Sequence, residues 1–437
     1  MESRDLIVTP VLLMLVYAGA YIVRPWVTDQ TNRKYFLPAL SVRIIGALAL
    51  GFIYQFYYNG GDTFNYHTHG SRHIWEAFID SPSNGFQLLF AGKEHVGQTF
   101  KYSSQIAFFG DPSSYFIVRI AAVIDLLTFS SYSATAVVFA VISFAGMWAF
   151  FLTFYRAYPN VSGWIAITIL FVPSVFFWGS GILKDTVTLT ALGFLTFAIR
   201  RIFIEKRINA TSIFLLIVCT FVIYSVKKYI LLCYLPAALV WVQTVRLASI
   251  KSAIVRVMVV PFFLIAVLAS SYYAVTIVGE NDEKYAMENL AKTAQITAYD
   301  IGYYTGRGAG SSYSIGELDG TFTGMLKLIP QAVNVSLFRP YLWEASNPLM
   351  LLSALESLVV FGLTIFVIYR KRLVLVEAIR NPDILFCLIF SVTFAFAVGV
   401  STFNFGTLTR YKIPLIPFYL LALILMLNYS KSDKKFL

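Results

Sequence analysis

Long apolar runs separated by short polar stretches form the pattern of this chain. A run of about 17 or more apolar residues is long enough to cross the hydrocarbon core of a bilayer as a helix. On this basis we predict about eleven transmembrane helices, over residues 6–23, 36–55, 132–155, 162–178, 184–200, 212–226, 229–245, 255–278, 348–369, 383–400 and 413–429. The predicted fold class is an all-α polytopic membrane protein, with residues 1–437 forming a single transmembrane domain.

Two long polar segments, 56–131 and 279–346, interrupt the apolar runs. In the first segment, Ser71–Phe78 and Gly85–Ala91 have the pattern of short amphipathic helices that lie on the membrane surface. Ser114–Phe129 is apolar but contains two charged residues, so we place it at the interface as well.

The second polar segment divides into two parts. Its first part, from Gly279, carries alternating charges and predicts a charged helix. Residues 302–324 are rich in Gly, Ser and Tyr and predict a mobile loop, either a lid over a cavity or a solvated connector.

Composition and charge agree with a membrane protein. Hydrophobic residues make up 58% of the chain and charged residues 13%, which excludes an ordinary soluble fold. The net charge of +11 comes largely from Lys and Arg in short connections between predicted spans. If all eleven spans form, these connections share one side, which is then cytoplasmic. Basic loops that face anionic membrane lipids explain the charge, so we predict no nucleic-acid partner. The two long segments then place the chemistry on the outer face.

The strongest candidate for chemistry is Asp62, in the stretch Asn59-Gly60-Gly61-Asp62 directly after the second predicted span. A carboxylate at the membrane boundary, on a Gly-Gly turn that lets the backbone approach a ligand, is costly unless it has a function. We therefore predict that Asp62 is catalytic.

All four histidines of the chain follow Asp62 in the same segment, at positions 67, 69, 73 and 95. Carboxylate and imidazole groups at this density could hold a divalent cation. Their spacing matches no metal-binding motif, and interfacial histidines often only form hydrogen bonds. We therefore assign no metal ligands.

Other candidates lie where predicted spans meet the outer face. They are Lys184 and Asp185 beside two glycines, Lys227 and Lys228, Arg339 with Glu344, and Arg410 with Tyr411. Guanidinium and ammonium groups at headgroup depth are suited to phosphate oxygens and sugar hydroxyls. Two of these clusters also have a structural alternative. Lys184 and Asp185 could form a pair in which Asp185 caps the helix, and Lys227 and Lys228 could snorkel to the interface.

Gly61-Asp62 followed by Tyr66 in the first large outer loop, with Arg410-Tyr411 and Pro414 to Pro417 opening the last span, resembles the GT-C superfamily of integral-membrane glycosyltransferases. The resemblance covers the whole chain in architecture and only these short motifs in residues. The chain departs from the superfamily pattern because two spans, not one, precede the catalytic loop.

The resemblance implies a sugar donor on polyprenyl phosphate or pyrophosphate, and a glycan or lipid acceptor. Asp62 would be the general base on the acceptor hydroxyl. Arg410, and after it Lys184, Lys227 and Lys228, would hold the lipid phosphate. We predict that the full set of residues that bind substrate is Tyr66, His67, His69, Lys184, Asp185, Lys227, Lys228, Arg339, Glu344, Arg410 and Tyr411.

Three other functions stay open. A polysaccharide polymerase or ligase that uses an undecaprenyl-linked glycan would favour paired arginines over a catalytic carboxylate. A transporter of lipid-linked glycans would carry charges near mid-membrane, where Arg43 and Glu356 are the main candidates. A structural subunit would leave Asp62 unexplained. For localisation we predict the bacterial inner membrane, with the active site facing the periplasm or exterior.

Overall fold

The structure, a computed structural model, describes residues 2–429 apart from 93, 95–96, 307–309 and most of 249–287. The predicted span 255–278 and the start of the predicted charged helix fall largely outside the described residues. The described chain is helical, with a single isolated β-bridge between Ser312 and Asn404. It divides into two compact units.

Unit 1 comprises residues 1–162, 170–197 and 214–227. Its helices, some of which extend a few residues beyond these limits, are α1 (Ser3–Val27), α2 (Arg33–Phe56), α3 (Asp62–Tyr66), the π-helix η1 (His67–Ser71), α4 (Arg72–Asp80), α5 (Pro82–Phe90), α6 (Phe100–Ser103), α7 (Pro112–Thr128), α8 (Tyr132–Tyr155), α10 (Pro173–Trp178), α11 (Lys184–Ile199) and α12 (Ala210–Val226).

Unit 2 comprises residues 163–169, 198–213 and 228–437. Most of each of the following helices belongs to it: α9 (Ser162–Leu170), the π-helix η4 (Arg200–Ile204), α13 (Lys228–Ala248), α15 (Leu290–Asp300), the π-helix η6 (Ile301–Gly306), α16 (Phe322–Lys327), α17 (Ile329–Phe338), the short turn η7 (Leu342–Glu344), α18 (Pro348–Lys371), α19 (Leu375–Ile379), α20 (Pro382–Ser401), α21 (Phe405–Tyr411) and α22 (Leu415–Asn428).

Within the described residues, seven helices are long and apolar enough to cross a membrane: α1, α2, α8, α11 with η4, α13, α18 and α20. The chain is therefore an all-α, multi-pass membrane protein. Helices α4 and α5 lie where we predicted two short helices, at 71–78 and 85–91. The predicted count of eleven spans is not confirmed.

Three predicted spans differ from the structure. Span 162–178 is broken into α9 and α10, because Pro173 cannot donate a backbone hydrogen bond and holds Val172 in an extended conformation. Span 212–226 corresponds to α12, which is shorter than the seven spanning helices. Span 413–429 corresponds to α22, which forms with the preceding α21 a pair of helices bent by 66° at a break over residues 412–414.

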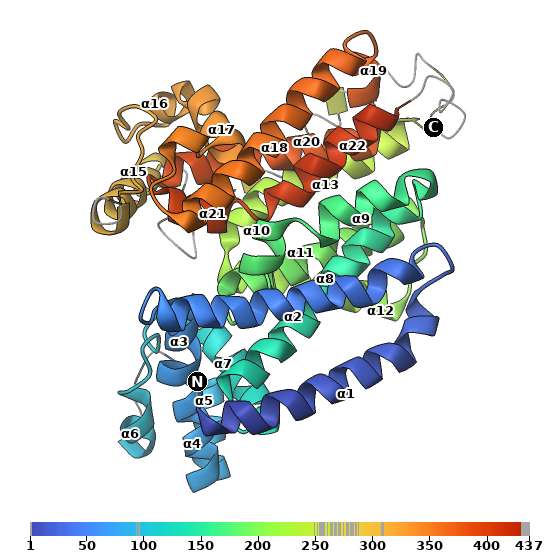
Figure 1. The fold of residues 1–437 in the computed structure, drawn as a ribbon. Coiled ribbons are helices and arrows are strands. Elements are labelled where there is room, and N and C mark those ends of the chain that lie inside the picture. Colours follow the sequence, from blue (N-terminus) through green and yellow to red (C-terminus); the bar gives the residue numbers. More distant parts are fainter. Residues whose placement is uncertain are drawn as a thin grey trace. The chain divides into compact units, whose positions relative to one another are not determined.

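The core of unit 1 lies between α2 and α8, which pack side by side (Figure 1). The Phe36 ring of α2 packs edge-on against Phe144 and Trp148 of α8, with centroid distances of 4.9 and 5.0 Å. Such aromatic contacts add to the apolar area that these helices bury. They fix the α8 helix, whose first residues form part of the site described below.

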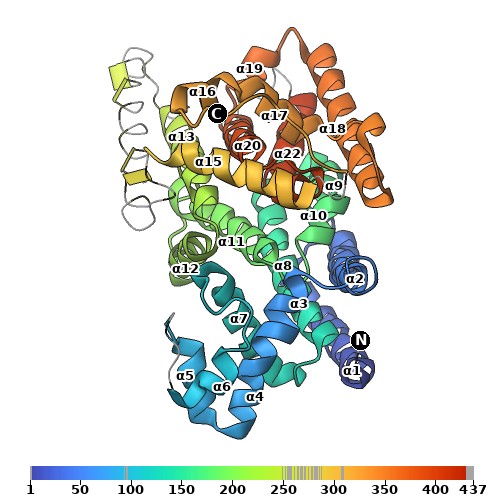
Figure 2. The same ribbon diagram turned by 90° about the vertical axis from the view of Figure 1, so that its left-hand side faces the viewer.

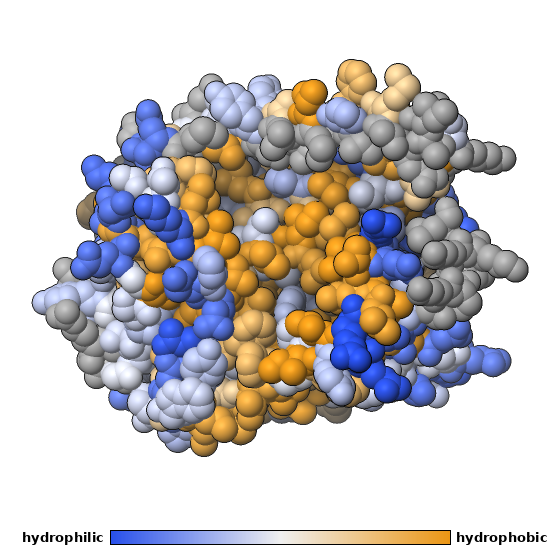
Figure 3. All heavy atoms as spheres, turned by 90° about the horizontal axis from the view of Figure 1, so that it is seen from above, coloured by the Kyte–Doolittle hydropathy of each residue, from blue (hydrophilic) through white to orange (hydrophobic). Residues whose placement is uncertain are grey.

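In unit 2, α20 lies among α13, α17 and α22 (Figure 2). Phe386 of α20 stacks on Trp241 of α13 at 4.3 Å, and Phe390 packs against Phe418 of α22 at 4.7 Å. By contrast, α18 exposes large apolar side chains, including Leu352 and Val359. Figure 3 shows one face of the molecule, on which apolar side chains gather between hydrophilic ones at two opposite ends. An apolar surface of this kind suits contact with lipid.

Candidate functional site

The turn before Asp62 has backbone angles that favour glycine. Gly60 and Gly61 both have φ of 124°, and Asn59 has φ of 55°. Residues with a Cβ rarely adopt these angles. The Gly60 amide donates to the Tyr54 carbonyl at 2.8 Å, which ties the turn to the end of α2. Asp62 is the first residue of α3 and is half-buried.

Tyr132, near the start of α8, holds the α3 helix in place. The Thr63 and Tyr132 hydroxyls are hydrogen-bonded at 2.7 Å, and Thr63 is fully buried. The Phe64 ring stacks on the Tyr132 ring at 4.6 Å with an interplanar angle of 17°. The segment that follows Asp62 is therefore fixed on a membrane-length helix.

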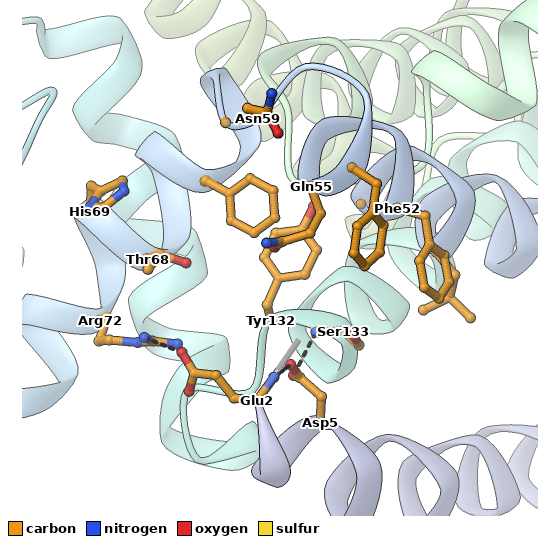
Figure 4. A pocket seen from close by; sticks show the side chains of 15 residues that line it. Glu2, Asp5, Phe52, Gln55, Asn59, Thr68, His69, Arg72, Tyr132 and Ser133 are labelled. Carbon is orange, nitrogen blue, oxygen red and sulfur yellow. Dashed lines mark hydrogen bonds and ion pairs between the residues drawn. The ribbon is translucent and has the colours of Figure 1, made fainter.

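A cavity of about 440 Å³ opens beside this segment, entirely within unit 1. It lies among α1, α2, the α3–η1–α4 segment and the start of α8 (Figure 4). Its polar lining includes Glu2, Asp5, Gln55, Asn59, His69 and Arg72. Four aromatic residues, Phe52, Phe56, Phe64 and Tyr132, also line it.

The charged groups of this cavity are already paired. Arg72 Nη1 lies 2.6 Å from a Glu2 carboxylate oxygen, and Figure 4 shows the two side chains pointing at each other. The Asp5 carboxylate accepts hydrogen bonds from Ser131 Oγ at 2.7 Å and Ser133 N at 3.2 Å. The neutral side chains of Gln55 and Asn59 are exposed. They can donate to and accept from a polar ligand in the cavity.

Of the predicted residues, His69 lines this cavity, at its edge in Figure 4, and its side chain is exposed. The Asp62 side chain is not part of the lining, although Gly60 and Phe64 on either side of it are. Tyr66 is buried and its ring packs against Phe108 at 4.9 Å. Tyr66 therefore belongs to the packing of the loop, and its position does not support direct contact with a ligand in this cavity.

His67 is also fully buried, in a polar cluster of unit 1. Its Nε2 atom lies 3.3 Å from Asp125 Oδ1, without hydrogen-bond geometry. The Asp125 carboxylate accepts hydrogen bonds from Ser71 Oγ and Thr135 Oγ1, both at 2.6 Å. This cluster joins η1, α7 and α8 beneath the cavity segment. The structure thus gives His67 a position in the protein interior, not in a ligand site.

Two of the predicted phosphate-binding lysines are held by carboxylates within unit 1. Lys184 Nζ lies 3.1 Å from Asp111 Oδ2 and 2.7 Å from Ser113 Oγ. Partial burial alone would raise the pKa of the Asp111 carboxyl. The Ser114 hydroxyl and the Lys184 ammonium lower that pKa well below its usual range. Asp111 is therefore ionised at neutral pH and neutralises Lys184.

Lys227 forms an ion pair with Asp185, and both side chains are buried, at 8% and 1% exposure. Asp185 stands in the first turn of α11, where a carboxylate also stabilises the helix dipole. Lys184 and Lys227 thus both neutralise carboxylates of unit 1.

The remaining candidates lie in unit 2. Arg339 Nε lies 3.0 Å from Glu344 Oε2, which also accepts the Tyr341 amide at 2.8 Å. The Arg339 carbonyl accepts from the buried Lys412 ammonium at 3.1 Å. Arg339 and Glu344 are thereby linked to the break between α21 and α22.

Arg410 and Tyr411 end the α21 helix and are half-buried. Lys228 is the first residue of α13 and is half-buried too. The structure brings Arg339 and Glu344 together in unit 2. Asp62, His69, Lys184, Asp185 and Lys227 belong to unit 1.

No group of three or more His, Cys, Asp or Glu side chains in the described part of the chain is arranged to hold a metal ion. His73 pairs with Glu76 at 3.1 Å on α4. His95 lies outside the described residues.

Comparisons of this chain with protein-family models, with curated proteins and with solved structures find no match. The resemblance to the GT-C superfamily therefore stays a prediction, based on the motif around Asp62 and the motif at Arg410.

The sequence interpretation missed several residues that build the site, notably Asp111, Gln55, Arg72 and Tyr132. The position of Asp111 was recognisable from the sequence, because Asp-Pro-Ser-Ser is typical of a helix start. In the structure Asp111 caps α7. The other three lie within or beside predicted helices. Nothing in their spacing indicated that they face one cavity.

Proposed function

We propose that the chain is an integral-membrane glycosyltransferase of the GT-C type. It would move a sugar from a polyprenyl-phosphate or pyrophosphate donor to an acceptor hydroxyl at the extracytoplasmic face of the bacterial inner membrane. The observation that carries the proposal is the cavity beside the Asp62 turn. Asn59, Gly60 and Phe64 from the predicted motif line this cavity, together with amide, hydroxyl and aromatic groups from α2, η1 and α8.

The lining is suited to the sugar part of a lipid-linked donor. Amides and hydroxyls can exchange hydrogen bonds with sugar hydroxyls, while Phe52, Phe64 and Tyr132 offer apolar surface to the sugar ring. The cavity lies at the ends of membrane-length helices. A donor could therefore keep its polyprenyl tail in the bilayer while its headgroup occupies the cavity.

In the proposed reaction, Asp62 accepts the proton of the acceptor hydroxyl. The acceptor oxygen forms a bond to the anomeric carbon, and the bond from that carbon to the phosphate oxygen breaks. The phosphate departs with the electron pair. Among the cations that line the cavity, Arg72 is the candidate to stabilise the departing phosphate, because its partner Glu2 is 41% exposed and can give way to a ligand.

Arg410 of unit 2 stays a second candidate for the lipid phosphate. Lys184 and Lys227 become weaker candidates, since each would have to leave a carboxylate to bind an anion. His69 is a candidate to orient the acceptor from the edge of the cavity.

The test uses the full chain in liposomes with radiolabelled undecaprenyl-phosphate hexoses and pentoses, and follows cleavage of the donor. We expect Asp62→Asn to lower the rate by about 10²- to 10⁴-fold. Glu76→Gln is the matched control, because Glu76 lies on the neighbouring α4, is half-exposed and does not line the cavity. It should stay within about twofold of the wild type.

Cleavage that proceeds equally well in Asp62→Asn would refute the role of this carboxylate. If the same variant still extends an undecaprenyl-pyrophosphate glycan, the polymerase or ligase alternative is favoured instead. Failure of every donor in the panel would refute the proposed activity.

A further inference from the structure

Unit 2 contains a second hollow, which shares no lining residue with the cavity of unit 1. Its volume is about 570 Å³, within the range of about 300–1,000 Å³ that is typical of ligand sites. Its lining combines the aromatic residues Tyr299, Tyr303, Tyr313 and Phe403 with the polar residues Asp300, Ser312 and Ser314.

One wall of the hollow is built by the end of α15 and the start of η6. Tyr299 and Tyr303 are four residues apart, so on a helix their side chains lie on the same face. Their exposed fractions are 46% and 58%. Both tyrosine side chains therefore line the hollow and are accessible to a ligand.

Hydrogen bonds link the lining residues Tyr313 and Phe403 and their neighbours. The Tyr313 amide donates to the Phe403 carbonyl at 3.0 Å, and the Phe405 amide donates to the Ser311 carbonyl at 2.9 Å. The Tyr313 hydroxyl is hydrogen-bonded to Thr402 Oγ1 at 3.1 Å. The prediction of a mobile loop over 302–324 is therefore wrong for residues 311–313, which pair with 402–405.

Burial of the side chains alternates along residues 312–314. Tyr313 is buried, whereas Ser312 and Ser314 are exposed. Their hydroxyls, together with the exposed Asp300 carboxylate, add hydrogen-bonding groups to the aromatic walls. A ligand in the hollow would meet flat apolar surface and a rim of donors and acceptors.

We propose that this hollow binds an uncharged saccharide chain. A sugar ring has apolar C–H faces that pack on aromatic rings, and hydroxyl edges that suit the carboxylate and serine groups of the rim. Among the lining residues that the structure describes, Asp300 is the one charged side chain, and its carboxylate disfavours acidic glycans. A quaternary ammonium ligand would use the rings alone and leave the hydroxyl groups without a role.

Saccharide binding at this hollow does not depend on the proposed transferase activity. The two proposals also use different residues, because the hollow belongs to unit 2 and the Asp62 cavity to unit 1.

The experiment measures binding of cellohexaose, maltohexaose and chitohexaose to the full chain in nanodiscs by calorimetry, without any donor. We expect at least one hexaose to bind, and Tyr303→Ala to weaken its binding about tenfold. Tyr303→Phe keeps the ring and should stay within about threefold of the wild type. Ile296→Ala should match the wild type, because Ile296 lies on the same α15 helix, is 52% exposed and does not line the hollow.

Three results would overturn the proposal: binding of no hexaose, equal binding by Tyr303→Ala and the wild type, or binding of phosphocholine at this hollow in place of any sugar. Asp62→Asn separates the two proposals. If it binds the hexaose normally and no donor is cleaved even by the wild type, the transferase proposal fails while the saccharide site stands.

Discussion

The cavity of unit 1 and the hollow of unit 2 differ in the side chains that surround them. At the unit 1 cavity, Arg72 is paired with Glu2, and the same unit contains a buried polar cluster at Asp125. The unit 2 hollow exposes two tyrosine rings, and its described lining residues include one charged side chain.

This contrast indicates where mutations should act. A buried polar group that loses its partner keeps its desolvation cost, so changes beneath the unit 1 cavity should reduce stability. An exposed ring contributes little to folding, so changes in the unit 2 hollow should reduce binding with little loss of stability. The following predictions test this difference, beginning with the largest expected effect.

Asp125→Ala should be the most damaging change. The carboxylate is fully buried and accepts two hydrogen bonds of 2.6 Å, so its loss leaves Ser71 and Thr135 without their acceptor. We expect the free energy of unfolding in detergent to fall by about 3–5 kcal/mol. Hydrogen exchange should rise in α3, η1 and α4, but not in α15.

Asp80→Ala is the control for this prediction. Asp80 also accepts a side-chain hydrogen bond, from Tyr102, but its side chain is 52% exposed. Its removal should cost much less stability than Asp125→Ala, because water solvates this exposed carboxylate. Equal losses in the two variants would contradict the view that burial makes Asp125 important.

Lys227→Met tests whether this lysine is structural. It would leave the Asp185 carboxylate, 1% exposed, without its ion-pair partner. We expect a loss of about 3 kcal/mol in the free energy of unfolding, and partial recovery when Asp185→Leu is added, because replacing both members of a buried pair is often tolerated. If Lys227→Met has normal stability but binds undecaprenyl phosphate more weakly, Lys227 binds the lipid phosphate and is not structural.

The sequence predicted the long helices well and the pairing of charges poorly. Helices α1, α2, α8 and α18 were predictable because an apolar run of that length has few other stable conformations. The break at Pro173 was missed because the run is apolar on both sides of it. The turn at Asp62 was predictable from its two glycines.

The partners of the candidate charges could not be predicted. Lys184 and Asp111 are 73 residues apart, and Lys227 and Asp185 are 42 apart. Residue type alone shows that a lysine can bind phosphate. Only the fold shows that a carboxylate already holds it.

The Asp62 turn offers a matched pair of glycine substitutions. Both Gly60 and Gly61 have φ of 124°, but a Cβ on Gly61 would lie 2.9 Å from the Tyr54 ring, whereas nothing lies within 4 Å of one on Gly60. We expect Gly60→Ala to cost about 1 kcal/mol through backbone strain, and Gly61→Ala about 2 kcal/mol through strain and this contact. Thermal unfolding in detergent measures both. The reverse order would mean that the turn changes shape readily.

The smallest effect is expected at Glu344 of unit 2. Burial alone would raise the pKa of its carboxyl, but the Arg339 guanidinium and the Tyr341 amide lower it below the usual value of 4.5. Because the folded protein binds this proton more weakly than the unfolded chain, the carboxylate stabilises the fold above about pH 4.5, and this contribution is lost as the pH falls through the lowered pKa.

Glu344→Gln should therefore reduce the free energy of unfolding by about 1 kcal/mol at pH 7 and flatten its fall at acid pH. The exposed Glu317, also in unit 2, is the control, and Glu317→Gln should leave the profile unchanged. If Glu344→Gln reduced the free energy of unfolding as much as Asp125→Ala, the two units would not differ in how mutations affect their stability. A carboxylate with 18% exposure would then matter as much as one with none, and burial could not be the cause of the difference.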